Sequence, residues 1–167
     1  MPNRLSRRDL LAGVTAEMPG QAAAAVRLNI AVAHQLGMPL ADVQCMGLLV
    51  NGQSAPSQLA ASLGLTTGAV TKVLDWLERA GYIVRSADPS DRRRIVVSVD
   101  PAGLAALTRY FAPMGEKMSA HLASYTATEL ATILRFMRAG HQAADEEIAR
   151  VREQGIHHAT RRGHGAV

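Results

Sequence analysis

The sequence predicts a mainly α-helical protein with one two-stranded β-hairpin past its middle. Its 48% of hydrophobic residues include 29 Ala but only one Trp, three Tyr and two Phe. This composition favours helices that pack closely through small side chains. Apolar residues recur every three to four positions in several segments, whereas the period changes to two over residues 82–99. The length suits one domain, or one domain plus an accessory element.

The N-terminal part predicts two helices, divided at Pro19-Gly20. We expect residues 1–19 to form an extension that contains a short amphipathic helix, at about 6–17. A second helix fits about 20–36 and is apolar over most of its circumference, so we expect it to be buried. Residues 6–11 resemble a twin-arginine export signal, but a Glu and the Pro-Gly pair limit the apolar segment to seven residues. We therefore favour the helix.

Two short helices follow. Asp42 is placed to cap a helix that continues through Val50. Pro56 suits the first turn of the next helix, which extends to about Leu63, and Gly64 suits a left-handed C-cap after it.

The helix after this turn is predicted to be amphipathic. Thr66 is a good N-cap residue, and Gly81 ends the helix. We interpret Trp76 as a lateral packing residue. The buried stripe, at spacings of i, i+3, i+4 and i+7, consists of Val70, Val73, Leu74 and Leu77.

The rest of the chain predicts the hairpin and two long helices. β-rich runs over 82–85 and 95–99 are joined by a polar turn that ends in three arginines. Pro101 opens a helix to about Tyr125, and a capping box that begins at Thr126 starts a final helix. We expect that helix to end near residue 153 and residues 155–167 to be a disordered tail.

Two helices joined by a tight turn form a helix-turn-helix, which places its second helix in the major groove of DNA. Opposite its apolar stripe, the second helix presents threonines and Lys72. Threonine hydroxyls and methyls can contact base edges, while Gly68 and Ala69 allow close approach. The alternative role for the threonines is capping and solvation alone, and Thr66 is expected to cap in either case.

The hairpin turn predicts a second contact with DNA. Three consecutive arginines repel one another and suit a solvated loop, but beside a recognition helix they also suit a narrow minor groove. Asp88 or Asp91 could orient one guanidinium. Residues 54–100 hold six basic and five acidic residues, so binding must rely on localised charge and on two copies. The residues predicted to contact DNA are Ser57, Gln58, Thr66, Thr67, Gly68, Ala69, Thr71, Lys72, Arg92, Arg93 and Arg94.

These segments resemble the multiple-antibiotic-resistance regulator (MarR) family of winged helix-turn-helix repressors. The resemblance spans about residues 20–150. Its specific motifs are Leu59-Ala60, Leu63-Gly64-Leu65-Thr66, Val70-Thr71-Lys72, Leu77-Glu78-Arg79-Ala80-Gly81-Tyr82-Ile83 and Asp88-Pro89-Ser90-Asp91-Arg92-Arg93-Arg94.

The resemblance implies a winged helix-turn-helix DNA-binding domain over 42–100, with dimerisation helices over 20–41 and 101–154. It implies Arg93 as the minor-groove residue and Asp91 as its orienting partner. It also implies a ligand-responsive repressor that binds a pseudo-palindromic operator in double-stranded DNA as a homodimer. The long apolar faces of the C-terminal helices favour a dimer independently. A winged-helix module for protein association is the alternative, although such a surface more often carries exposed aromatic anchors.

The resemblance further implies a pocket for a small lipophilic or phenolic effector. Candidate lining residues are His34, Met38, Met46 and Met114, each of which also suits an ordinary core. Cys45 is either a peroxide-sensing thiol or a buried structural residue. We favour burial, because no neighbouring cation in the sequence lowers its pKa.

The sequence lacks two motifs that are typical of metalloproteases and of nucleotide-binding enzymes. We find no His-Glu-x-x-His element and no phosphate-cradling Gly loop, so we expect no enzyme and no cofactor. His141 and Asp145, four residues apart, would give a metal only two ligands, so we expect no metal. A single cysteine suits the reducing cytoplasm. The uncharged stretch 43–71 is interrupted by turn residues, so we expect no membrane partner.

Overall fold

The computed structural model describes residues 6–162. The chain is mainly helical with a two-stranded wing, as predicted. In chain order the elements are α1 (Arg7–Leu36), α2 (Leu40–Leu49), α3 (Pro56–Leu63), α4 (Thr67–Arg79), β1 (Ile83–Ala87), β2 (Ile95–Val99), α5 (Pro101–Leu122) and α6 (Ala127–Arg162).

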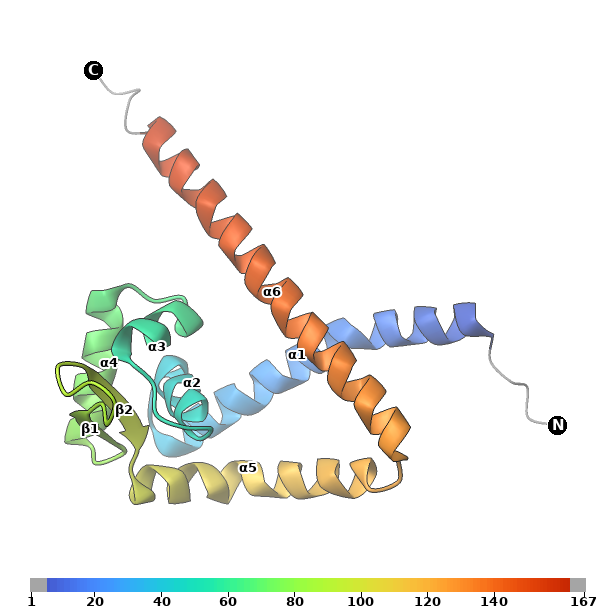
Figure 1. The fold of residues 1–167 in the computed structure, drawn as a ribbon, viewed down its shortest axis with the longest axis horizontal. Coiled ribbons are helices and arrows are strands. Elements are labelled where there is room, and N and C mark those ends of the chain that lie inside the picture. The colour runs from blue at the N-terminus through green and yellow to red at the C-terminus, as the bar shows by residue number, and fades with distance from the viewer. Residues whose placement is uncertain (1–5, 163–167) are drawn as a thin grey trace. The chain divides into compact units, whose positions relative to one another are not determined.

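The chain divides into two compact units, Met1–Met114 and Gly115–Val167. The first unit holds α1 to α4, the hairpin and the first part of α5. In this unit α3, α4 and the hairpin lie together beside α2 (Figure 1). The second unit holds the rest of α5 and α6. In the described part of the chain, no helix is both long and apolar enough to cross a membrane.

Helix α1 is continuous where we predicted two helices, and it includes Pro19. Ser6 begins it as expected: its hydroxyl accepts a hydrogen bond from Asp9 N at 3.2 Å, and the Asp9 carboxylate accepts one from Ser6 N at 3.1 Å. A proline removes one backbone hydrogen bond, but the run of four alanines that follows strongly favours helix and sustains it. The predicted break at Pro19-Gly20 is therefore wrong.

The expected burial of the helix over 20–36 is also wrong for a single chain. Only Val32 and Ala33 are buried in α1, while Val26 and Ile30 are 48% and 41% exposed. The apolar face of this helix is longer than the part that α2 and the rest of the core cover in one chain. Leu28 and Leu36 are partly buried against the core, whereas Val26 and Ile30 face outward.

Helix α2 begins at Leu40, so Asp42 lies inside its first turn and makes no side-chain cap bond there. The predicted cap at Asp42 is corrected to Pro39, the residue that precedes the helix. Asp42 is 4% exposed, and burial raises the pKa of its carboxyl.

The pair α3 and α4 begins and ends close to the predicted residues. Gly64 adopts the left-handed conformation, with φ 69° and ψ 23°. Its N–H donates to Ala61 O at 3.2 Å, and Leu65 N donates to Ala60 O at 2.9 Å. These two bonds form the Schellman motif that satisfies the last carbonyls of α3 and reverses the chain into α4.

The hairpin pairs antiparallel, from Ile83 opposite Val99 to Ala87 opposite Ile95. Its base is part of the core, because Ile83 and Val97 are buried. The core of the first unit joins this base to α2, α3, α4 and α5 through Val43, Cys45, Met46, Leu49, Leu59, Val70, Leu74, Leu77 and Leu107.

The C-terminal helix α6 starts at the predicted capping box. Thr126 N donates to the Glu129 carboxylate at 2.7 Å, and Glu129 N donates to the Thr126 hydroxyl at 3.3 Å. The helix ends at Arg162 rather than near Glu153, so the backbone over 155–162 is helical where we expected disorder. The remainder of the expected tail, 163–167, lies outside the described residues.

Candidate nucleic-acid interface

The N-terminal half of α4 presents an exposed face of small side chains. Thr66 caps the helix, because its hydroxyl accepts a hydrogen bond from Ala69 N at 3.2 Å. Thr67, Gly68, Thr71 and Lys72 are exposed, while Ala69 is half-buried. The Thr71 hydroxyl donates to Thr67 O at 2.8 Å, so it is held close to the helix as an outward acceptor.

The opposite face of α4 anchors the helix. Of the predicted stripe, Val70, Leu74 and Leu77 are at most 1% exposed, and Val73 is partly buried against the core. Trp76 packs at the side, with its ring centroid 6.2 Å from that of Tyr82, as its interpretation as a packing residue required. The exposed face is therefore carried by a fixed helix.

Helix α3 contributes Ser57 and Gln58, both of which are exposed. The Gln58 side-chain oxygen accepts hydrogen bonds from Ala55 N at 3.0 Å and from the Ser54 hydroxyl at 3.3 Å. Gln58 therefore has a structural role at the start of α3, in addition to any contact it makes with a ligand.

The wing turn brings three exposed arginines together, Arg92, Arg93 and Arg94. Asp88 shapes the turn: its carboxylate accepts hydrogen bonds from the hydroxyl and the backbone N of Ser90, at 2.7 and 2.8 Å. These bonds stabilise the charged form and lower the pKa of the Asp88 carboxyl.

Asp91 contacts Arg93 through the backbone. Its carboxylate accepts a hydrogen bond from Arg93 N at 3.1 Å and lies 3.9 Å from Nε of Arg94. Asp91 thus fixes the backbone from which the Arg93 side chain projects, while its ion pair is with the next arginine. The expected orientation of the Arg93 side chain by Asp91 stays a prediction.

Arg85 is a residue of this region that the sequence reasoning missed. It lies on β1, and its guanidinium bonds to the Asp75 carboxylate at 2.8 Å and to the Glu78 carboxylate at 2.7 Å, both on α4. The signal in the sequence was an arginine in a β-run, after two carboxylates one helical turn apart. All three residues belong to the charge balance of 54–100, which does not reveal that they pair.

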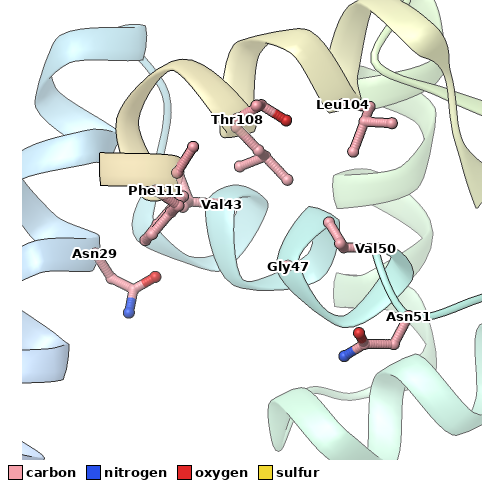
Figure 2. Close-up of a pocket in the computed structure, with 10 residues that line it drawn as sticks. Asn29, Val43, Gly47, Val50, Asn51, Leu104, Thr108 and Phe111 are labelled. Atoms are coloured by element: carbon pink, nitrogen blue, oxygen red, sulfur yellow. The ribbon is translucent and has the colours of Figure 1, made fainter. Parts of the chain in front are cut away.

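An apolar cavity of about 420 Å³ lies between α2 and α5, with Asn29 of α1 at one end and Asn51 at the other (Figure 2). Thr108 is the third polar residue of its lining, and none of the ten lining residues is ionisable. The apolar part of the lining consists of Val43, Gly47, Val50, Leu104, Leu107, Phe111 and Ala112.

The four residues named from the sequence for an effector pocket do not line this cavity. His34 and Met38 border a smaller hollow of about 370 Å³ at the end of α1. Met46 is fully buried in the core, and Met114 is 43% exposed. Met46 and Met114 lie on α2 and α5, which border the cavity, but other residues of these helices face it.

Cys45 is fully buried. Burial, and secondly the nearby Asp42 carboxylate, raise the pKa of its thiol to about 11. Such a thiol is protonated at neutral pH and a poor nucleophile, which supports the structural role favoured above. Among the described residues, no group of three or more His, Cys, Asp or Glu side chains could hold a metal ion.

Comparison with known proteins identifies a matching family and proteins of similar sequence. A family model described as the MarR family matches residues 48–95. The uncharacterized HTH-type transcriptional regulator YcgE of Bacillus subtilis (strain 168) is 33% identical over 129 residues, which cover 77% of this chain and 84% of that protein. The multiple antibiotic resistance protein MarR of Salmonella typhimurium is 30% identical over 95 residues, which cover 56% of this chain and 62% of that protein.

Solved structures share the fold at lower identity. The transcriptional regulator BldR from Sulfolobus solfataricus matches with a TM-score of 0.52 and 18% identity, over 81% of this chain and 99% of that one. A mutant of MepR from a multidrug-resistant S. aureus clinical isolate matches with a TM-score of 0.56 and 16% identity, over 84% and 99% of the two chains.

Proposed function

The chain belongs to the MarR family of transcriptional regulators, and we propose that it is a ligand-responsive repressor that binds a pseudo-palindromic operator in double-stranded DNA as a homodimer. One observation supports this most directly. The exposed, small-residue face of α4 and the three exposed arginines of the wing belong to one winged unit that is fixed by a common core.

In this proposal α4 enters the major groove. Its N-terminal residues approach base edges, and the Thr71 methyl and hydroxyl oxygen are available to them. Lys72 and the backbone N–H groups at the start of the helix suit phosphates. Arg93 enters the adjacent minor groove, where a narrow A·T-rich stretch concentrates negative potential.

The experiment is selection of bound duplexes from random DNA, followed by titration of the best duplex at several salt concentrations. We expect two related half-sites one helical turn apart, and log K that falls linearly with log salt. Arg93→Ala is expected to weaken binding by about tenfold. The slope of log K against log salt concentration should also become shallower, by about one for each arginine that no longer contacts a phosphate.

The matched control is Arg109→Ala, which removes an exposed arginine of α5 that lies over the Tyr110 ring at 5.5 Å. It should bind the duplex like the wild type. Failure to select any duplex, or binding that is independent of salt, would reject DNA binding and favour the protein-association alternative.

The cavity between α2 and α5 supports the ligand response. Its volume is in the range of small-molecule sites, and a mainly apolar wall with a few polar groups is typical of them. Since none of its lining residues is ionisable, we expect an uncharged aromatic or lipophilic ligand that hydrogen-bonds through the amides or Thr108. A carboxylate would be desolvated there without a partner.

A further inference from the structure

Arg85 connects the two parts of the molecule that the proposed function brings to DNA. It lies on β1 opposite Val97, three residues before Asp88, where the turn that ends in the wing arginines begins. Its guanidinium reaches back to α4 and contacts Asp75 and Glu78. Its side chain is 24% exposed, whereas those of Asp75 and Glu78 are 47% and 40% exposed.

The hairpin is held firmly at its base. Tyr82 N donates to Leu77 O at 2.9 Å, and Ser54 and Val97 exchange two backbone hydrogen bonds at 2.8 and 2.9 Å. Beyond Arg85, the β1 residues Ser86 and Ala87 are exposed. Three residues of strand span about 10 Å, so a small rotation of the hairpin near Arg85 displaces the arginine turn considerably.

From this geometry we infer that Arg85 is a positioning residue: it fixes the wing against α4 so that the turn arginines and the α4 face reach the same duplex. The planar guanidinium suits this role, because it bonds two carboxylates at a defined angle. Because a partly buried ion pair is weak evidence for stability, the role that we assign to Arg85 is geometric. The inference rests on the proposed function.

A different role for Arg85 would be charge neutralisation. Asp75 and Glu78 follow Thr71 by four and seven residues, so the three side chains lie along one side of α4. Without Arg85 the two carboxylates would repel phosphates near the bound helix. The two roles differ in what a neutral version of the cluster should do.

The first test is a set of variants titrated against the selected duplex. We expect Arg85→Met to weaken binding about tenfold, which is a loss of about 1.4 kcal/mol in binding free energy. The triple variant Arg85→Met, Asp75→Asn and Glu78→Gln removes the unpaired carboxylates, and we expect it to remain as weak as the single variant. Recovery of wild-type affinity in the triple variant would overturn positioning in favour of charge neutralisation.

The second test is a double-mutant cycle with the wing. If Arg85 acts through the wing, its removal should cost little once Arg93→Ala is present, so the double variant should bind about as weakly as Arg93→Ala alone. Effects that multiply would show that Arg85 acts independently of the wing and would overturn the inference.

Footprinting gives a direct readout of position. In Arg85→Met, minor-groove protection from hydroxyl radicals should disappear at the wing site, while major-groove guanine protection from methylation at the α4 site should remain. An equal decrease of both protections would overturn the inference. Arg85→Lys, which keeps the charge without the planar fork, should recover affinity only in part and serves if the Met variant unfolds.

Two controls separate the inference from its premise. Thermal unfolding identifies variants that have lost the fold, and Arg109→Met removes an arginine elsewhere and should bind normally. If the wild type binds no duplex, the proposed function fails and this inference with it. If the wild type binds and Arg85→Met binds equally well, only the inference fails.

Discussion

Two glycines show opposite reasons for the absence of a side chain: one is required by close packing, and the other has open space around it. A Cβ built on Gly103 would lie 2.2 Å from the carbonyl oxygen of Tyr82 and 3.0 Å from Cγ2 of Val99. That carbonyl also accepts a hydrogen bond from Asp100 N at 2.9 Å, so it is held in place. A Cβ on Gly68, in contrast, would meet nothing within 4 Å.

We therefore expect Gly103→Ala to reduce the free energy of unfolding by about 1–3 kcal/mol, because the start of α5 must move away from the hairpin. Gly68→Ala should raise it by about 0.5–1 kcal/mol, since alanine favours helix, and should weaken duplex binding by blocking close approach. Urea unfolding and the duplex titration measure both effects. A Gly103→Ala variant as stable as the wild type would contradict the close approach.

The features that shape the predicted DNA-contacting face could be read from the sequence because their signals are local. Capping by Thr66 and the left-handed turn at Gly64 depend on neighbours within four positions. The Arg85 cluster was missed because its partners lie seven and ten positions away, on another element. Their pairing depends on how β1 packs against α4.

At the scale of elements, the orientation of two helices about their own axes determines which residues line the cavity. Helices α2 and α5 turn Gly47, Val50, Leu104 and Thr108 toward one another (Figure 2). Periodicity predicted that α5 has an apolar face. It did not predict which residues of a broad face border a space that the neighbouring side chains leave unfilled.

A cavity-filling variant tests the ligand proposal. A Cβ on Gly47 would meet nothing within 4 Å, so Gly47→Met can be accommodated and would occupy the cavity. We expect the wild type to bind 2-naphthol, which is neutral at neutral pH, and to bind the 2-naphthoate anion much more weakly. Calorimetry should show at least about a tenfold decrease of naphthol affinity in Gly47→Met.

The matched control is Gly13→Met, at a position of α1 that does not line the cavity and where a Cβ again meets nothing within 4 Å. It should bind naphthol like the wild type. Equal binding of the anion and the neutral compound would contradict the chemistry assigned to the cavity.

At the scale of the whole molecule, a single chain leaves long apolar faces exposed. On α5 the residues Met114, Met118 and Leu122, spaced by four, are 43%, 40% and 38% exposed. On α6 Phe136 and Met137 are 52% and 56% exposed. Monomeric proteins rarely leave faces of this kind uncovered, so they support the proposed homodimer.

We expect the wild type to sediment as a dimer at micromolar concentration, and Leu122→Glu to shift it toward monomer because a charge would be buried in the interface. Ala120→Glu places the same charge on a different side of α5 and should leave the dimer intact. Because one dimer presents two α4 helices, dissociation of the dimer should also weaken duplex binding strongly. A monomeric wild type would contradict the proposal.

The sequence by itself determined the order of the elements, the helix pair with its turn, the hairpin and the basic wing, because caps, turn residues and periodicity act over a few positions. Only the tertiary structure decided that Asp42 is buried, that Arg85 joins β1 to α4 and that the cavity is lined by other residues than those expected. These features depend on the packing of segments distant in the chain. Side-chain type alone does not encode which of several similar faces meet.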